Sequence, residues 1–299
     1  MKVIVLMSTY NGEKYLETQL ESILAQEGVN IDILVRDDGS KDSTHIILDN
    51  YQREGKLHWY TGDNLKPARS FMNLVQNAPD ADYYAFSDQD DYWEPDKILT
   101  AIKQLNSFDQ DKPSLYYSRY TMVDKDLKKI PQGKDKLYVS LTMKQAVVSS
   151  AATGCTMVFN KCLLNYLKLK HPSFQIMHDN WVHKVCVALG GNLYFDETSH
   201  ILYRQHGNNA IGGDTNLRKR LKRHINTAFK DPCYRSKSII ALYKCYGEYM
   251  PVSNRKICHL VCNYHKGLNR FKLAFDRGYR TQNKRINLIF VVATLLGVF

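Results

Sequence analysis

The chain has no C-x-x-C pair among its seven cysteines, and their odd number fits no disulfide framework. Free thiols in a reducing compartment are therefore expected, which argues against a small disulfide-stapled secreted protein. Cys258 and Cys262 are spaced to share one face of a helix. Core packing is the favoured interpretation of that pair, with metal binding the minor alternative.

Long hydrophobic runs are also absent. The longest apolar segment, residues 286–299, has 14 residues, fewer than the ~20 that span a bilayer. It is long enough to lie at a membrane surface. The apolar run of five residues near the start reads as a strand rather than a signal peptide.

Two common nucleotide-binding motifs are missing. The sequence contains no G-x-x-x-x-G-K-[ST] loop, and the first predicted strand is followed by "STYNG" rather than by G-x-G-x-x-G. A P-loop enzyme is therefore excluded, and a dinucleotide site is unsupported. A phosphohydrolase with an aspartyl nucleophile, D-x-D-x-[TV], is disfavoured because Tyr92 occupies the fifth position of "DQDDY".

The positive charge is spread unevenly. The net charge is +11, yet residues 217–285 hold 18 Lys and Arg against three acidic residues, so residues 1–216 balance at −4. An acidic body with a basic tail suggests a segment that binds an anionic surface. A solvated helical tail with an apolar dimer patch is the plainer alternative, and nucleic-acid binding through the tail is a more distant one.

Short apolar runs alternate with amphipathic segments in the first third of the chain. Strands are predicted at residues 3–7, 31–35, 57–60 and 83–86, and helices at 11–26, 43–55 and 68–77. This order predicts an α/β fold with a mostly parallel, Rossmann-like sheet flanked by helices. Further on, strands are expected at 115–124, at 151–160 with a glycine kink, at 193–197 and at 200–206, and a helix at 178–191.

Polar clusters follow three of the predicted strands: "STYNG" (8–12), "RDDGS" (36–40) and "SDQDD" (87–91). Ligands of open α/β sheets bind beyond the carboxyl ends of the strands. The three clusters are therefore expected to face one crevice, although each alone could be an ordinary turn or helix cap.

The third cluster places Asp88, Asp90 and Asp91 within four positions. Carboxylates this close do not ionise together without a cation or hydrogen-bond donors. A solvated turn is the plain alternative, but the aromatic residues around the cluster indicate partial burial. Mg²⁺ or Mn²⁺, held through one or two carboxylates and a diphosphate, fits this chemistry.

Two later segments add weaker candidates. Asp179 in "MHDNW" is either a helix cap or a general base facing the crevice. The segment "YRQHGNNAIGG" (203–213) has the glycines of a loop that closes over a phosphate. His206 in this segment is either a second metal ligand or a structural histidine.

In combination, the motifs resemble glycosyltransferase family 2, of the GT-A fold. The resemblance rests on "VLMSTYNGEKYLETQLESILAQ", "VRDDGSKDST" and "SDQDDYWEPDKI", and covers about residues 1–213. The forms "SDQDDYW", "HDNW" and "YRQHGNN" are similar to the bacterial rhamnosyltransferase-like branch. The Q-x-x-R-W motif of processive members is absent, so transfer of one sugar per binding event is expected.

The resemblance implies roles for residues of the matching motifs. Asp91, with His206, would hold the metal, and Asp179 would be the catalytic base. Nucleotide and donor would be bound by Thr9, Tyr10, Asn11, Asp37, Asp38, Arg69, Asp88 and Asp90, with Asp38 or Asp37 holding the base. Several families have an acidic pair at the position of the base; here His178 precedes Asp179, which matches the rhamnosyltransferase-like branch.

The implied activity is a metal-dependent, inverting hexosyl transfer from a nucleoside diphosphate sugar to a glycan or lipid-linked acceptor in cell-surface polysaccharide synthesis. Rhamnose from dTDP-rhamnose is favoured; glucose, galactose or an N-acetylhexosamine from a UDP donor is the alternative. A pyrophosphorylase is disfavoured because "STYNG" lacks its Gly-rich, Arg-containing loop.

The organisation follows from these assignments. A catalytic domain is expected at residues 1–213 and a basic, mainly helical region at 214–299. The expected location is the cytoplasm, peripheral at the inner face of the plasma membrane.

Overall fold

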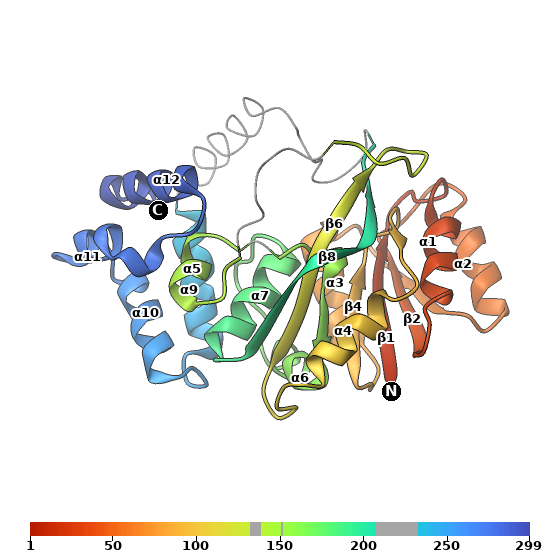
Figure 1. Ribbon diagram of the computed structural model, residues 1–299, viewed down its shortest axis with the longest axis horizontal. Helices are drawn as coiled ribbons and strands as arrows, with labels where there is room; N and C mark the ends of the chain where they lie inside the picture. The colour runs from red at the N-terminus through yellow and green to blue at the C-terminus, as the bar shows by residue number, and fades with distance from the viewer. Residues whose placement is uncertain (132–138, 151, 207–232) are drawn as a thin grey trace.

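The fold is built around one twisted sheet with helices on both faces (Figure 1). The computed structural model describes residues 1–131, 139–150, 152–206 and 233–299. Within these residues the sheet has eight strands in the order β3-β2-β1-β4-β7-β6-β8-β5. The strands are β1 (Lys2–Thr9), β2 (Asn30–Asp37), β3 (His58–Thr61), β4 (Tyr83–Ser87), β5 (Tyr92–Trp93), β6 (Ser114–Val123), β7 (Val158–Asn160) and β8 (Asn192–Arg204).

Among the described residues up to 206, the helices first alternate with the strands and later follow one another with fewer strands between them. They are α1 (Leu16–Leu24), α2 (Thr44–Arg53), α3 (Lys66–Asn77), α4 (Lys97–Leu105), α5 (Met143–Val148), α6 (Lys161–Leu169) and α7 (His178–Ala188), with a 3₁₀ turn η1 (Gly154–Thr156) before β7. The C-terminal helices are α9 (Tyr234–Tyr246), α10 (Val252–Cys262), α11 (Asn269–Phe275) and α12 (Lys284–Leu296), with η2 (Arg277–Tyr279) between the last two.

Alternation along the central strands divides the interior into two cores. Val3, Val5 and Met7 of β1 face one way and pack with α1 and α4. Ile4 and Leu6 face the other way and pack with α3, α6 and α7. Because successive side chains of a strand point to opposite faces, an apolar run without polar gaps is what a strand covered on both sides requires.

The α/β fold predicted from the sequence is confirmed. β1 pairs in parallel with β2 and β4, and β2 pairs in parallel with β3, so the carboxyl ends of four strands meet at one edge. Beyond β4 the sheet becomes mixed, because β7 runs antiparallel to both β4 and β6.

The second half corrects three predicted elements. The predicted strand at 151–160 is a strand only at 158–160, since its glycine lies in the turn η1. The two strands predicted at 193–197 and 200–206 are one strand, β8, whose pairing with β6 shifts register twice. The helices α5 and α6 were not predicted. Their apolar stripes are too short for hydrophobic periodicity to separate them from loops.

Helix α7 begins one residue before Asp179, which therefore does not cap it. The N-cap position is Met177, and no side-chain cap bond is present there. The helix ends before two glycines: Gly190 adopts φ +73°, and the Gly191 amide donates to the Cys186 carbonyl at 2.9 Å. A left-handed residue followed by such a bond is the usual helix end.

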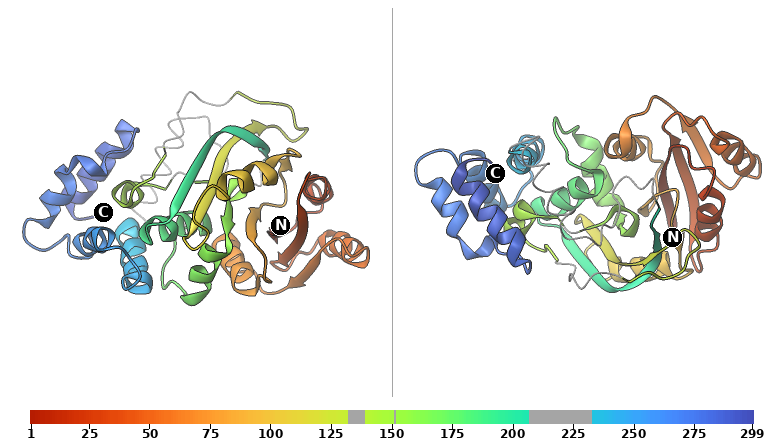
Figure 2. Two further views of the ribbon diagram at one scale, coloured as in Figure 1. Left: turned by 60° about the horizontal axis from the view of Figure 1, so that its bottom comes forward. Right: turned by 90° about the horizontal axis from the view of Figure 1, so that it is seen from above.

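The C-terminal helix α9 shares a hydrophobic core with the preceding part of the chain. Ile239, Leu242 and Tyr246 of α9 lie in the same core as Trp181 and Val185 of α7. The helices α11 and α12 lie at the end of the molecule away from α1 and α2 (Figure 2). The predicted domain boundary at residue 213 falls outside the described residues.

The mainly helical character predicted for the tail is confirmed for the part that the structure describes. None of its helices has the length and apolar content that crossing a bilayer would require, and the same is true of the other described helices.

Candidate active site

The candidate site begins where β1, β2 and β4 end together. Thr9 closes β1 and is in register with Asp37 of β2, while Met7 is in register with Ser87 of β4. The three polar clusters predicted to share a crevice are therefore brought to one edge of the sheet. This edge is where ligands of open α/β sheets bind.

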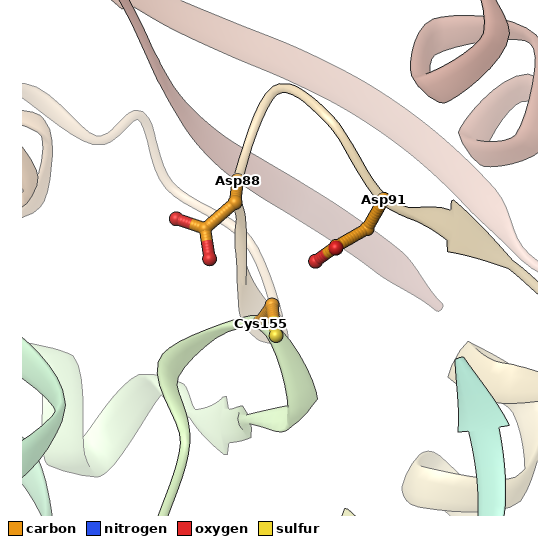
Figure 3. A group of neighbouring side chains, drawn as sticks. All are labelled: Asp88, Asp91 and Cys155. Carbon is orange, nitrogen blue, oxygen red and sulfur yellow. The ribbon is translucent and has the colours of Figure 1, made fainter. Parts of the chain in front are cut away.

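The acidic cluster occupies the loop that follows β4. Figure 3 shows Asp88 and Asp91 at the two ends of this short loop, with Cys155 reaching toward it from the neighbouring turn. One ligand atom of each of these three side chains lies within 4.8 Å of the others. Asp91 is fully buried, and Asp90 remains 15% exposed.

Burial and mutual repulsion dominate the electrostatics of this loop. Burial, followed by the charge of Asp90, raises the pKa of Asp88 and raises that of Asp91 still more. One Asp91 oxygen, Oδ2, is buried without a hydrogen-bond partner among the described residues. A buried carboxylate with an unused oxygen next to like charges is a site that favours a cation.

Arg204, at the end of β8, holds the acidic loop in place. Its amide donates to Asp91 Oδ1 at 3.0 Å, and its Nε donates to the Asp90 carbonyl at 2.7 Å. The guanidinium also donates to the Lys125 carbonyl and lies 4.5 Å from the Tyr15 ring centroid. Sequence reasoning missed this role, because the parallel pairing of β8 with β6 that delivers Arg204 has no local signature.

His206 lies beside Asp90 rather than beside Asp91. Its Nε2 is 2.6 Å from Asp90 Oδ2, and its ring is 4.9 Å from the Tyr15 ring. The group of possible ligands found among the described residues consists of Asp88, Asp91 and Cys155 and does not include His206. Metal binding by His206 thus stays a prediction, and the rest of its predicted loop, residues 207–213, lies outside the described residues.

Asp179 lies close to the cluster, next to the turn η1. The Gly154 amide, next to Cys155 in η1, donates to Asp179 Oδ2 at 3.3 Å. Burial raises the pKa of Asp179 to about 6, and the backbone amides of Asn180, Gly154 and Asp179 itself partly offset this effect. Its charge also contributes to the raised pKa of Asp88, so the two carboxylates are close enough to interact.

His178 packs against the same turn as a neutral side chain. It stacks on Phe71 at 3.9 Å between ring centroids and meets Phe86 edge-on. Burial lowers the pKa of His178 to about 3. A Cβ added at Gly154 would lie 2.5 Å from His178 Nε2, so only glycine fits there without displacing the ring.

The predicted nucleotide residues divide into internal and accessible ones. Asp37 is fully buried and accepts hydrogen bonds from Thr9 Oγ1 at 2.8 Å and Ser40 Oγ at 2.6 Å, and His45 Nε2 lies 2.7 Å away. These bonds lower the pKa of Asp37 even though burial opposes them. Asp37 and Thr9 therefore organise the loop from within.

Of the remaining candidates, Asp38 is also buried, whereas Tyr10 and Arg69 are exposed. Asp38 pairs with Arg36, and both side chains are 4% exposed. Tyr10 is 47% exposed, and Asn11 adopts φ +48°. Arg69 is exposed on the first turn of α3, directly after the loop that follows β3.

The donor set suits a divalent cation that prefers oxygen ligands. Asp88 and Asp91 offer carboxylate oxygens, and the Cys155 thiol is kept protonated because burial and the two carboxylates raise its pKa. A protonated thiol is a poor ligand, since metal ions bind the thiolate. Mg²⁺ or Mn²⁺ fits these residues better than Zn²⁺.

A cavity is also present away from the acidic loop. A cavity of about 780 Å³ is lined by Met1, Tyr83, Asn106 and Asn160, at the amino ends of β1 and β4. It is therefore at the opposite end of the strands from the acidic loop.

Comparisons with known proteins agree with the geometry. Residues 4–164 match the model of "Glycosyl transferase family 2". The chain belongs to this family. It is 31% identical over 239 residues to "dTDP-rhamnosyl transferase RfbG" of Shigella flexneri, covering 73% of this chain and 77% of that protein. The family and the rhamnosyltransferase-like resemblance read from the sequence are confirmed.

Solved structures confirm the GT-A type of fold. TarS of S. aureus in complex with UDP-GlcNAc has a TM-score of 0.55 at 16% identity, covering 94% of this chain and 92% of that one. The mannosyltransferase PcManGT of Pyrobaculum calidifontis, in complex with GDP-Man and Mn²⁺, has a TM-score of 0.51 at 16% identity, covering 98% and 86%. This glycosyltransferase of family 2 thus has neighbours that bind nucleotide sugars.

The contact between η1 and α7 gives a testable prediction. Gly154→Ala should lower the free energy of unfolding by about 1–3 kcal/mol, because the new methyl group overlaps the His178 ring. His178→Ala in the same chain should relieve part of this loss, since it frees the space. Chemical denaturation of both single variants and the double variant measures the coupling. Strictly additive losses would show that the two side chains do not compete for this space.

Proposed function

We propose that this chain is a metal-dependent, inverting glycosyltransferase that moves one sugar, with rhamnose favoured, from a nucleoside diphosphate to a glycan or lipid-linked acceptor of cell-surface polysaccharide synthesis. The observation that carries the proposal is the buried acidic loop after β4 with Asp179 facing it across η1. The similarity to a dTDP-rhamnosyl transferase supports dTDP-rhamnose as the donor. A UDP-hexose is the second candidate, supported by the fold shared with a UDP-GlcNAc complex.

The acidic loop would bind the donor. Asp91 and Asp88 would hold Mg²⁺ or Mn²⁺, whose chemistry is to offset the charge that gathers on a leaving diphosphate. Asp90, fixed by His206, is the exposed carboxylate of the loop and is assigned to the donor sugar and ribose. Tyr10, Asn11, Asp38 and Arg69 are assigned to the nucleotide, because they lie at or beyond the ends of β1, β2 and β3.

Asp179 is assigned as the general base. A base must be unprotonated to take the proton of an acceptor hydroxyl, and a pKa of about 6 leaves Asp179 mostly ionised at pH 7 while making it more basic than an ordinary carboxylate. Attack from the face opposite the leaving diphosphate would invert the anomeric carbon.

The first test is donor turnover. We expect one of dTDP-rhamnose, UDP-glucose, UDP-galactose and UDP-N-acetylglucosamine to be consumed in the presence of Mn²⁺ or Mg²⁺, with dTDP-rhamnose the first choice. Asp91→Asn should lower turnover by about 10²-fold or more, because it removes a carboxylate that holds the cation. Release of the nucleoside diphosphate measures the rate.

Asp80→Asn is the matched control. This carboxylate is exposed and pairs with Lys161 near the amino ends of the strands, so its loss should leave turnover unchanged. Turnover by Asp91→Asn at the wild-type rate would refute the assignment of the acidic loop.

The second test is the pH dependence of kcat. Since the base works when deprotonated, kcat should rise tenfold per pH unit below about pH 6 and level off above it. Asp179→Asn should lower kcat by about 10²–10⁴-fold and remove this step, while nucleotide binding is retained. A wild-type kcat that is flat from pH 5 to pH 8 would contradict the assignment of Asp179.

The C-terminal helices supply a surface for an anionic membrane, which would place the enzyme at the inner face of the plasma membrane. Leu268, Phe271 and Phe275 form an exposed apolar stripe at α11, and Leu288, Val292 and Leu296 form another on α12. Residues 252–299 carry nine Lys and Arg and one acidic residue, Asp276, which pairs with Lys144. Exposed apolar side chains with surplus basic charge favour an anionic lipid surface.

Vesicle sedimentation tests this surface. The protein should bind phosphatidylglycerol vesicles at least tenfold more tightly than phosphatidylcholine vesicles. Lys272→Glu with Arg285→Glu should remove most of this preference, because each basic residue contributes ~1 kcal/mol near an anionic surface. Lys103→Glu on α4 is the control. Equal binding to both vesicle types would argue against the membrane role.

A further inference from the structure

A small pocket lies beside the first turns of α7, on the side where the C-terminal helices pack. It encloses about 140 Å³, and its lining includes Ser150, Asn180, Lys184, Tyr234, Arg235 and Ile286. These residues come from the end of α5, from α7, from α9 and from α12, which lie around one another in Figure 1. The catalytic part and the C-terminal extension therefore build the pocket together.

Two cations line the pocket without an opposite charge. Lys184 is 2% exposed, and its Nζ donates to Ser238 Oγ at 3.2 Å, a neutral partner. Arg235 has no ion pair among the described residues, and no carboxylate of the described chain lines the pocket. Burial, followed by the charge of Arg235, lowers the pKa of Lys184 to about 7. A buried cation next to a second cation is costly unless an anion joins them.

Polar atoms with unused bonding capacity lie in the same pocket. The Ser150 hydroxyl and the Asn180 amide oxygen are buried, and neither has a hydrogen-bond partner in the described part of the chain. Buried polar atoms normally find a partner in protein, water or ligand. A hydroxyl donor and two cationic donors together suit an oxyanion.

The pocket is adjacent to the proposed base. Asn180 follows Asp179 directly in the first turn of α7, and Lys184 lies one turn further along the same face. The pocket has room for several waters, since one water needs about 10–15 Å³ of such volume. It is large enough for a phosphate group and too small for a nucleotide sugar, so it is distinct from the donor site at the acidic loop.

We propose that this pocket binds a phosphate group of the acceptor and so places the acceptor hydroxyl next to Asp179. This inference rests on the proposed transferase function, because only then does the substrate bound beside α7 have a hydroxyl to lose. It gives the C-terminal extension a second role, since Arg235 of α9 would help to select phosphorylated acceptors.

The test is calorimetric titration with inorganic phosphate and with geranyl phosphate, after Mg²⁺ and whichever of dTDP and UDP binds have filled the donor site. Geranyl phosphate should bind, and Arg235→Gln should weaken its binding at least tenfold without changing the affinity for that nucleotide. Lys244→Gln, an exposed cation of the same helix α9, should bind like the wild type. Lys184→Met should abolish binding; because it alters a buried side chain, Arg235→Gln remains the deciding variant.

The other outcomes overturn the proposal. Inorganic phosphate binding as tightly as geranyl phosphate would assign the pocket to free phosphate rather than to the acceptor. Unchanged binding by Arg235→Gln, or no binding of either probe at 10 mM (about −2.7 kcal/mol), would mean that the pocket is not an anion site. If dTDP or UDP binds with Mg²⁺ in those samples, only the pocket proposal fails; if neither nucleotide binds, the proposed function fails with it.

Discussion

The main physical constraint on the site is the repulsion between the carboxylates that the fold brings together after β4. Burial and neighbouring charge raise the pKa of both Asp88 and Asp91. The protein offsets this cost only in part. The Arg204 amide donates to Asp91, and the Lys97 ammonium, buried over the Trp93 ring at 3.6 Å, is attracted by Asp91, although burial lowers the pKa of Lys97 to about 7. The remaining deficit is what a divalent cation and a diphosphate donor would complete.

The two halves of the sheet contribute different parts of the site. The loops assigned to the nucleotide follow the parallel strands β1 and β2, and the acidic loop follows β4. The mixed half of the sheet contributes η1 and the end of β8. Gly154 lets η1 approach α7, so that Asp179 faces the acidic loop across a single turn of chain. In the proposed function, donor and acceptor chemistry would be divided between the two halves of the sheet.

The sequence predicted the parallel half well because its signals are local. Apolar runs, amphipathic helices and polar strand ends each lie within a few residues, and the polar strand ends do share one edge of the sheet. The roles expected of Asp91 and Asp179 stay predictions. Long-range pairing was not predictable: Cys155 and Arg204 reach the acidic loop only through the pairing of β4 with β7 and of β6 with β8. The internal role of Asp37 was equally hidden. Its carboxylate accepts hydrogen bonds from Ser40 and from Thr9, and Thr9 lies 28 residues earlier in the chain, so the sequence alone did not show that the carboxylate is occupied.

The most direct test of the account is a crystal structure grown with Mn²⁺ and dTDP or UDP, with data collected for the anomalous signal of manganese. The account predicts one strong anomalous peak within coordination distance of Asp91, with the diphosphate on its far side and the nucleotide over the ends of β1 and β2. A nucleotide bound there with no metal peak, or a peak remote from Asp88 and Asp91, would contradict the central claim that this acidic loop is a cation site.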